Sequence, residues 1–272
     1  MKTGMEGKKV LITGSTKGIG RGCANIFAGE GSYVIVTGRD QANCDRVAAE
    51  IQSMYPESKV RGVAADLRVK EDIERLYAET TKDGPLDVLV NNAGIYPTAS
   101  GKIKPFLELT DEDYELLWNM DFISSMRLAR LAFKDMMERN YGKIIFVTSE
   151  AALRPNKDVI AYGAVKAAAT ALARGMAEAT KGTRVTVNSV LPVTTITEGH
   201  IGYLESYAKT RGLTGGVEEA KKDYFINGND APSLIGRFTT VEECAMTVLF
   251  AAANDGVNGN SVLIDGGVIR HI

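Results

Sequence analysis

The chain has 272 residues, enough for one or two domains, and its 44% hydrophobic and 24% charged residues are typical of a globular protein. This balance excludes disorder and a collagen-like structure. The 32 Lys and Arg residues are matched by 34 Asp and Glu residues, so the basic surplus of a nucleic-acid-binding protein is absent.

The cysteines and the apolar stretches indicate in which cellular compartment the protein is expected. Three scattered cysteines without a C-x-x-C motif (Cys23, Cys44 and Cys244) indicate reduced thiols in the cytoplasm, with neither a disulfide framework nor a zinc site. No apolar stretch approaches the roughly 20 residues of a membrane span, and the apolar run after the basic first residues is too short for a signal peptide. We therefore expect a cytoplasmic protein that binds neither nucleic acid nor membrane.

Short apolar, β-branched runs alternate with longer stretches of helical periodicity. Near-continuous apolar runs are typical of strands that are buried on both faces of a parallel sheet. The intervening stretches, such as 41–54 and 69–82, are long enough for one crossover helix each. The pattern predicts an α/β fold: a single Rossmann-type domain over residues 1–272, with a doubly wound parallel seven-stranded sheet and helices on both faces. The expected strands are 9–13, 33–37, 60–64, 88–91, 143–148, 184–190 and 261–264.

Two later helices carry start signals, and a long insert separates them from each other. Residues 110–113 (TDED) approximate a capping box and open a helix expected to run to about Arg139, while residues 240–243 (TVEE) form a full capping box. Residues 194–238 are rich in glycine and contain no clear strand. A connection this long inside a compact domain is usually a lid or binding loop, so we expect a small helical substrate lid there.

A glycine-rich loop follows the first expected strand. Its glycines let the backbone approach a pyrophosphate, and the next helix offers free N–H groups and the positive end of its dipole. No Gly-Lys-Ser/Thr follows, so the spacing is not that of a P-loop. The alternative is that these glycines are needed only for the tight turn between strand and helix and bind no phosphate. The residues expected to contact a dinucleotide here are Gly14, Ser15, Thr16, Lys17, Gly18, Ile19 and Gly20.

The residues after the second strand bear on the choice of dinucleotide. An acidic residue there would bind the ribose 2′-hydroxyl of NAD, but the expected position is Gly38 and a cation, Arg39, follows it. Lys17 adds a second cation, and both would attract a 2′-phosphate. The sequence therefore favours NADP(H) over NAD(H). Two alternatives remain: both cations are solvated surface charges, or the neighbouring Asp40 weakens the preference.

Three polar side chains suggest acid–base chemistry. Tyr162 and Lys166 are four residues apart and share one helix face, and Ser149 ends the fifth strand. A cation within ~4–6 Å would favour the phenolate and lower the tyrosine pKa from near 10 by about 1–3 units. Tyr162 would then donate a proton in reduction and accept one in oxidation, while Ser149 hydrogen-bonds the substrate oxygen. The alternative is an ordinary helical pair of a packed tyrosine and a solvated lysine.

In their order and spacing, the loop at 13–20, the Asn-Asn-Ala-Gly at 91–94, Ser149 and Tyr162-x-x-x-Lys166 resemble the classical short-chain dehydrogenase/reductase family. The resemblance covers nearly the whole chain except residues 194–238, and 3-oxoacyl-[acyl-carrier-protein] reductases are the nearest members. It implies hydride transfer between a nicotinamide and a small carbonyl or secondary-alcohol substrate, with Lys166 at the nicotinamide ribose. It also implies cofactor contacts from Asp66 and Leu67 at the adenine, from Asn91, Ala93 and Gly94 at its ribose, and from Pro192, Thr195 and Thr197 at the nicotinamide end.

Two positions depart from the family pattern. Asp121 stands where the family has its fourth catalytic residue, an Asn that holds a water linking the lysine to solvent. An ionised Asp donates no hydrogen bond, and its charge would favour protonated Lys166 and weaken the pull of that cation on Tyr162. Val193 replaces the usual glycine after Pro192, which would narrow the nicotinamide pocket or alter the turn.

These departures motivate an alternative function, a catalytically weak dinucleotide-binding sensor or regulatory protein. The intact Ser149, Tyr162 and Lys166 favour the enzyme. The two histidines, His200 and His271, have no partner at ligand spacing, so no metal site is expected, and His200 is expected on the lid surface. The family pairs helices that begin near Thr110 and Asp158 between subunits, which implies a homodimer or homotetramer.

Overall fold

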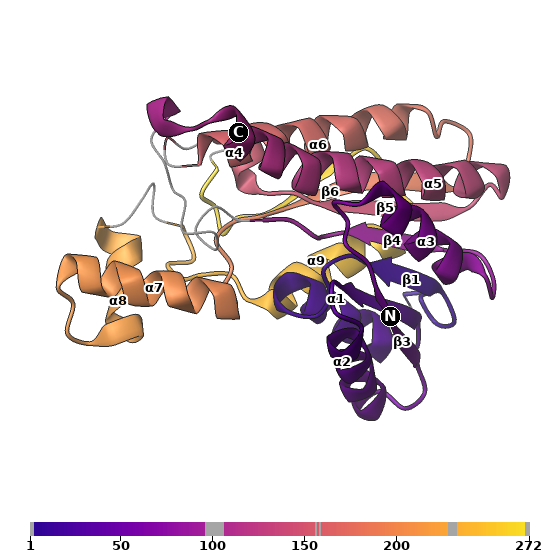
Figure 1. Cartoon of the computed structure of the whole chain (residues 1–272), viewed down its shortest axis with the longest axis horizontal. Coiled ribbons are helices and arrows are strands. Elements are labelled where there is room, and N and C mark those ends of the chain that lie inside the picture. Colours follow the sequence, from indigo (N-terminus) through magenta and orange to yellow (C-terminus); the bar gives the residue numbers. More distant parts are fainter. Residues whose placement is uncertain (1–2, 96–105, 156, 158, 228–232, 270–272) are drawn as a thin grey trace.

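The computed structural model describes residues 3–95, 106–155, 157, 159–227 and 233–269. They contain one seven-stranded sheet with the order β3-β2-β1-β4-β5-β6-β7, and all of its pairings are parallel (Figure 1). The strands are β1 (Lys9–Ile12), β2 (Tyr33–Gly38), β3 (Lys59–Ala64), β4 (Val88–Asn91), β5 (Gly142–Val147), β6 (Val185–Pro192) and β7 (Ser261–Ile264). The predicted strands are confirmed, with ends that differ by at most two residues.

Helices connect the strands and confirm the doubly wound arrangement. The long helix expected from Thr110 to about Arg139 is divided by a π-helical turn, η3, in which the buried Asp121 lies. The helices are α1 (Gly18–Gly29), α2 (Gln41–Met54), α3 (Lys70–Thr81), α4 (Asp111–Leu117), α5 (Ser124–Glu138), α6 (Ile160–Glu178), α7 (Glu198–Arg211), α8 (Gly216–Asn227) and α9 (Val241–Ala253), with the shorter turns η2 (Phe106–Glu108), η3 (Trp118–Ile123) and η4 (Glu150–Ala152).

Alternate residues of each central strand enter two separate cores. Val10 and Ile12 of β1 pack with α1, α2 and α9, whereas Leu11 between them packs with α3, α5 and α6. Figure 1 shows α5 and α6 on one side of the sheet and α1, α2 and α9 on the other. Because successive side chains of a strand point to opposite faces, a sheet covered on both faces requires the continuous apolar runs seen in the sequence.

Both expected capping boxes are present. The Thr110 side chain accepts a hydrogen bond from the backbone N–H of Asp113, whose carboxylate accepts one from the backbone N–H of Thr110. Thr240 and Glu243 make the same pair of contacts at the start of α9. Each box satisfies two N–H groups that a helix start would otherwise leave without an acceptor, and so fixes where the helix begins.

The insert forms a helical pair, α7 and α8, that stands beside the sheet in Figure 1. Leu204, Ala208, Ala220 and Phe238 form a buried cluster between its elements. Helix α7 ends at Gly212, whose φ of 66° is the left-handed conformation typical of a glycine cap. The insert is therefore the small helical lid that the sequence predicts, with an apolar core of its own.

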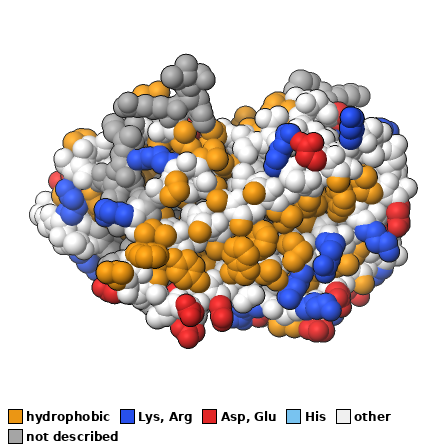
Figure 2. All heavy atoms as spheres, turned by 90° about the horizontal axis from the view of Figure 1, so that it is seen from above, with side chains coloured by type: hydrophobic (Ala, Val, Ile, Leu, Met, Phe, Trp, Pro, Cys, Tyr) orange, Lys and Arg blue, Asp and Glu red, His pale blue; other side chains and the backbone are white. Residues whose placement is uncertain are grey.

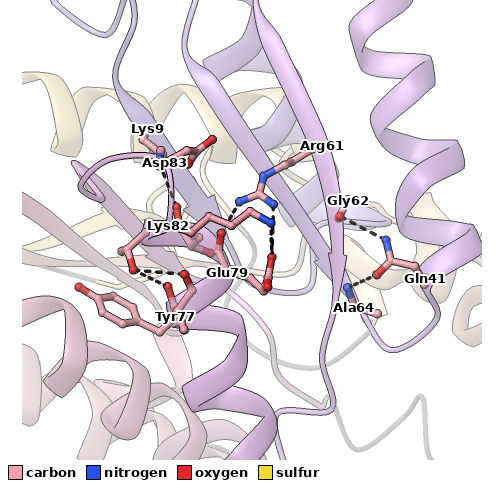
Figure 3. Close-up of polar contacts among 12 residues, drawn as sticks. Lys9, Gln41, Arg61, Gly62, Ala64, Tyr77, Glu79, Lys82 and Asp83 are labelled. Carbon is pink, nitrogen blue, oxygen red and sulfur yellow. Dashed lines mark hydrogen bonds and ion pairs between the residues drawn. The ribbon is translucent and has the colours of Figure 1, made fainter.

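The open edge of the sheet at β3 is covered by a side chain of α2. Gln41 accepts a hydrogen bond from the backbone N–H of Ala64 and donates one to the carbonyl of Gly62 (Figure 3). These backbone groups face away from β2, where another strand would otherwise pair. The glutamine thus protects an edge that could template association with a second chain.

Lys9, at the start of β1, is a buried lysine with a full set of acceptors. Its Nζ donates to the carbonyls of Thr80 and Gly84 at 3.0 and 2.8 Å and to the Asp83 carboxylate at 2.5 Å (Figure 3 shows Lys9 and Asp83). Its side chain is only 6% exposed, whereas Lys59, 3.6 Å from the same carboxylate, is 65% exposed. A buried ammonium is tolerated only when it is paired and hydrogen-bonded in this way.

We expect Lys9→Met to lower the free energy of unfolding by about 2–4 kcal/mol, because two carbonyls and a carboxylate lose their donor. Lys59→Met removes the exposed cation from the same carboxylate and should change stability little. Urea unfolding of both variants measures the difference. Equal losses in the two variants would contradict the role given to Lys9.

Candidate active site

A cleft of about 710 Å³ lies where β1, β2, β4, β5 and β6 end, between the sheet and the α7–α8 lid. The strand order reverses at this point, because β1 pairs with β2 on one side and β4 on the other. In open α/β sheets such a switch point, at the carboxyl ends of the strands, is where ligands bind. The cleft has the size of a typical small-molecule site.

The glycine loop forms one wall of the cleft and fits a pyrophosphate. A Cβ at Gly20 would lie 2.4 Å from the carbonyl oxygen of Gly14 and 2.5 Å from the side-chain nitrogen of Asn92, so only glycine allows this packing. Lys17 caps α1 without a side-chain hydrogen bond, and the first turn of α1 contains no acidic residue. The helix N-terminus is therefore left for an anion.

Cations gather at the end of the cleft near β2. Lys17 and Arg39 line the cleft, and neither forms an ion pair with a carboxylate within the described part of the chain. Arg68 also lines it and is held by Asp66, whose pKa it lowers to about 2 through hydrogen bonds. Asp40 instead caps α2 by accepting the backbone N–H of Asn43 at 2.7 Å, and it does not line the cleft.

Most of the residues predicted to form the site line this cleft. Those that do so are Gly14, Thr16, Lys17, Gly18, Ile19, Arg39, Asp66, Leu67, Ala93, Gly94, Ser149, Tyr162, Pro192, Thr195 and Thr197. Those that do not are Ser15, Gly20, Asn91, Asp121 and Lys166.

Ser15 is buried in the loop after β1 and Asn91 is buried at the end of β4, and neither lines the cleft. The Ser15 hydroxyl donates to the carbonyl of Ile12 at 2.7 Å and accepts from the backbone N–H of Thr37 at 2.9 Å, which ties the glycine loop to β2. The side-chain nitrogen and oxygen of Asn91 have no partner among the described residues. The contribution of Ser15 is therefore to hold the shape of the loop.

The structure brings Asp121 and Lys166 together as a buried ion pair. Lys166 Nζ lies 3.2 Å from Asp121 Oδ2, and their side chains are 7% and 0% exposed. Asp121 Oδ1 accepts the backbone N–H of Ile95 at 2.8 Å. Burial raises the pKa of Asp121, while the Lys166 charge and the Ile95 hydrogen bond oppose that rise. A Cβ at Gly94 would lie 2.8 Å from Asp121 Oδ2, so glycine is needed for this approach.

Tyr162 faces more negative charge than positive. Burial raises the pKa of its phenol above the usual value, the charges of Asp121 and Glu150 raise it further, and its hydrogen bond with Ser149 opposes the rise. The lowering expected from Lys166 is wrong for this structure. Lys166 Nζ lies 5.4 Å from the centre of the tyrosine ring, but its charge is matched by the carboxylate of Asp121. The charge of Asp121 acts on Tyr162 in the direction that the sequence analysis expects, since it raises the pKa of the phenol.

Glu150 is a residue of the cleft that the sequence analysis missed. Ser149 Oγ donates to Glu150 Oε2 at 2.6 Å and accepts the backbone N–H of Ala151 at 3.2 Å. Burial raises the pKa of the Glu150 carboxyl, opposed chiefly by the Ser149 hydrogen bond and also by the charge of Arg154. The available signal was its position: a carboxyl directly after a serine that ends a strand at the cleft.

Val193 fits the turn after β6 without strain. Its backbone N–H donates to the carbonyl of Ile264 at 3.0 Å, and its carbonyl accepts from Thr195 Oγ1 at 2.9 Å. Among the described non-glycine residues only Asn140 has a positive φ, so this position does not require glycine. Val193 lines the cleft, whereas the Thr195 hydroxyl is held by Thr239 at 2.9 Å.

The lid contributes aromatic side chains to the cleft. Tyr203, Tyr224 and Phe225 line it, whereas Tyr207 donates to Asp223 within the lid at 2.8 Å. His200 also lines the cleft, with its ring centre 5.3 Å from that of Tyr203, so its expected surface position is wrong. Because burial lowers the pKa of His200 to about 4, the imidazole is neutral at neutral pH.

The described residues show no group of three His, Cys, Asp or Glu side chains placed to hold a metal ion. His271 and Asp158, which entered the sequence predictions, lie outside the described residues. None of the helices in the described ranges is both long and apolar enough to cross a membrane.

Comparisons with known proteins agree with this geometry. The family model for short chain dehydrogenases matches residues 8–205. The chain is 39% identical to the uncharacterized oxidoreductase YvrD of Bacillus subtilis over 98% of both chains. It is 30% identical to a 3-oxoacyl-[acyl-carrier-protein] reductase of Aquifex aeolicus, over 98% of this chain and 100% of that one.

A solved structure extends the likeness to the whole fold. The L-sorbose reductase of Gluconobacter frateurii, complexed with NADPH and L-sorbose, superposes with a TM-score of 0.90 and 26% identity over 100% of both chains. The family match, the curated relatives and the cleft at the switch point therefore lead to one conclusion. The chain belongs to the short-chain dehydrogenase/reductase family and is an oxidoreductase that uses a nicotinamide cofactor.

Proposed function

We propose that this protein is an NADP(H)-dependent carbonyl reductase or secondary-alcohol dehydrogenase in which Tyr162 is the general acid and base. The observation that carries the proposal is the position of the Tyr162 and Ser149 side chains in the same cleft as the glycine loop. A substrate oxygen that meets these two hydroxyls lies in the compartment that also fits a dinucleotide. The curated relatives, which are oxidoreductases and reductases, favour this function over a sensor.

The bound cofactor would supply a hydride to the carbonyl carbon in reduction, or accept one from the alcohol in oxidation. Tyr162 donates its phenolic proton to the carbonyl oxygen, and the hydroxyl of Ser149 stabilises the charge that develops there. Lys166 would hold the nicotinamide ribose, and Pro192, Thr195 and Thr197 would bound the nicotinamide end. Asp121 holds the lysine in place through their ion pair.

The acidic neighbours of Tyr162 favour reduction at neutral pH. Reduction requires the protonated phenol, which is the form that a raised pKa preserves. Oxidation requires the phenolate, which forms only as the pH rises toward that pKa. We therefore infer a reductase near neutral pH whose reverse activity appears under alkaline conditions.

Two observations support NADP(H). Lys17 and Arg39 line the end of the cleft beyond β2, where a 2′-phosphate would need cations, and Asp40 is occupied at the N-terminus of α2. The L-sorbose reductase with the same fold binds NADPH. Exposed Lys17 and Arg39 could otherwise be solvated charges, but their shared position on the cleft is what phosphate recognition requires.

We further propose a cytoplasmic homodimer or homotetramer, with residues 1–272 as one catalytic domain and 194–238 as its substrate insert. Leu116, Trp118 and Leu153 are large apolar side chains exposed on or near α4 and η4. Figure 2, which views the molecule from the side of α4, α5 and α6, shows hydrophobic side chains gathered in a band across this face. Such a band supports pairing between subunits.

The three cysteines are free and buried, in keeping with a reducing compartment.

We expect Tyr162→Phe to lower the turnover of ketone reduction by about 10²- to 10⁴-fold, because the proton donor is lost. Binding of NADPH should remain, since the ring is retained. A panel of ketones and oxoacyl thioesters with NADPH, followed by nicotinamide absorbance, measures turnover, and cofactor fluorescence measures binding. Tyr207→Phe, in the lid but outside the cleft, is the control. Full turnover in Tyr162→Phe would remove the tyrosine from the mechanism.

Asp121→Asn should shift the pH dependence of alcohol oxidation to lower pH by about one unit or more, because it removes a negative charge that raises the phenol pKa. The profile of kcat/KM against pH reports this for the free enzyme. Asp223→Asn in the lid should leave the profile in place. If the Asp121→Asn profile does not move, this carboxylate has no control over Tyr162.

Arg39→Ala should weaken NADPH binding by about 10- to 100-fold and NADH binding little, because a charge-assisted contact to the 2′-phosphate is lost. Fluorescence titration with each cofactor measures both affinities. Arg46→Ala, which removes an exposed arginine of α2 paired with Glu50, is the matched control. Equal weakening of both cofactors would contradict recognition of the 2′-phosphate.

A further inference from the structure

We propose that Glu150 determines substrate specificity by accepting a hydrogen bond from a hydroxyl group on the carbon next to the reacting carbonyl. The preferred substrates would then be α-hydroxy ketones, and vicinal diols in the reverse direction. This inference rests on the proposed carbonyl reduction, and it names the substrate class of the same cleft.

The first step of the argument is that the hydroxyl of Ser149 is already engaged. A serine hydroxyl has one O–H to donate, and here it is donated to Glu150 Oε2 at 2.6 Å. To stabilise charge on a substrate oxygen, Ser149 must turn that hydrogen away from Glu150. Substrate binding therefore takes a hydrogen bond away from the carboxyl.

The second step concerns what Glu150 is left with. It lines the cleft, and desolvation is the largest influence on its pKa, so a lost donor is not fully replaced by bulk water. The backbone N–H of Ala151 and the charge of Arg154 remain near it. A desolvated acceptor that loses its donor lowers the stability of the complex, on the order of 10- to 100-fold in kcat/KM.

The third step is that an adjacent substrate hydroxyl supplies the missing donor. The substrate oxygen and Glu150 Oε2 are both within hydrogen-bond reach of Ser149 Oγ, so they lie at most roughly 5.5 Å apart. A hydroxyl on the neighbouring carbon spans this gap with one hydrogen bond to the carboxylate. Ser149 can then serve the carbonyl oxygen while Glu150 stays satisfied.

The other carboxylates of the cleft are not placed to accept a hydrogen bond from a hydroxyl next to the reacting carbonyl. Among the described lining residues they are Asp66, which is held by Arg68, and Glu198, which is exposed in the first turn of α7. Of these described carboxylates, Glu150 is the one that is hydrogen-bonded to Ser149. An α-hydroxyl is therefore recognised beside the reacting oxygen, whereas a simple ketone or a 3-oxoacyl thioester does not replace the hydrogen bond that Glu150 loses from Ser149.

The test compares ketones that differ in one group. The three-carbon set is 1-hydroxypropan-2-one, 1-methoxypropan-2-one and propan-2-one, and the ring set is 2-hydroxycyclohexanone, 2-methoxycyclohexanone and cyclohexanone. The methoxy compounds keep the electron-withdrawing oxygen next to the carbonyl but have no O–H group to donate to Glu150. The measured quantity is kcat/KM with NADPH for the unmodified protein and for Glu150→Ala, Glu150→Gln and Glu198→Ala.

We expect the unmodified protein to prefer the hydroxy over the methoxy ketone by at least about tenfold in kcat/KM. Glu150→Ala should bring this ratio close to one, whereas Glu198→Ala should retain it. Glu150→Gln keeps the size and an acceptor oxygen, so an intermediate ratio is expected. Fluorescence titration with NADPH shows whether each variant still binds the cofactor, and the Gln variant carries the test if the Ala variant does not fold.

The outcomes separate the two proposals. Reduction of all ketones with equal kcat/KM, or a preference that survives in Glu150→Ala, overturns the role of Glu150 and leaves carbonyl reduction intact. An equal loss on all three ketones of a set in Glu150→Ala also overturns it, since the carboxyl would then act on Ser149 alone. Failure to reduce any carbonyl compound overturns the proposed function and this inference together.

Discussion

The site depends on one buried ion pair, that of Lys166 with Asp121. The two charges lie 3.2 Å apart with their side chains almost entirely removed from solvent, and the second oxygen of Asp121 binds the backbone of Ile95. The pair therefore joins α6, the π-helical turn η3 and the segment after β4. Removing one partner from such a pair leaves an uncompensated buried charge, which is why neither side chain can be treated as independent of the other.

The electrostatics of the Tyr162 and Ser149 hydroxyls, to which we assign the proton chemistry, follow from neighbouring carboxyls. Asp121 compensates the lysine and raises the pKa of Tyr162, and Glu150 raises it again while holding the hydroxyl of Ser149. In the free site, both hydroxyls therefore keep their protons and Ser149 gives its hydrogen to Glu150. In the proposed function, a substrate oxygen would compete with Glu150 for the hydrogen of Ser149, so this hydrogen bond would affect which substrates bind well.

The sequence was a good guide where local pattern decides the structure. The strands were predictable because burial on both faces demands apolar runs, and the glycine loop and the spacing of Tyr162 and Lys166 are local features. The π-helical turn was not predictable, since it interrupts a continuous helical pattern around a single buried Asp121. The pKa direction of Tyr162 was missed for a related reason: the sequence suggests that Asp121 opposes Lys166, but not that burial and the charge of Glu150 also raise the pKa of the phenol. The cleft position of His200 involves a ring contact with the distant Phe238, which no local pattern reports, whereas Glu150 bonds its own neighbour Ser149 and was missed although its position was an available signal.

The insert is joined to the rest of the molecule near one place and has an apolar cluster of its own. Its two ends meet at the bridge between Thr195 and Thr239, and their hydroxyls lie 2.9 Å apart. Between these ends the lid is held together by its own apolar cluster. At its start, Thr197 caps α7 and lies 3.6 Å from where a Cβ of Gly18 would be, so the lid begins against the phosphate-binding loop. Ser149 follows β5, and Tyr162 and Lys166 lie on α6, whereas the aromatic side chains that line the cleft come from the insert. In the function proposed above, Glu150 would constrain the atoms next to the reacting carbonyl through its bond to Ser149, and the insert would constrain the more distant part of the substrate.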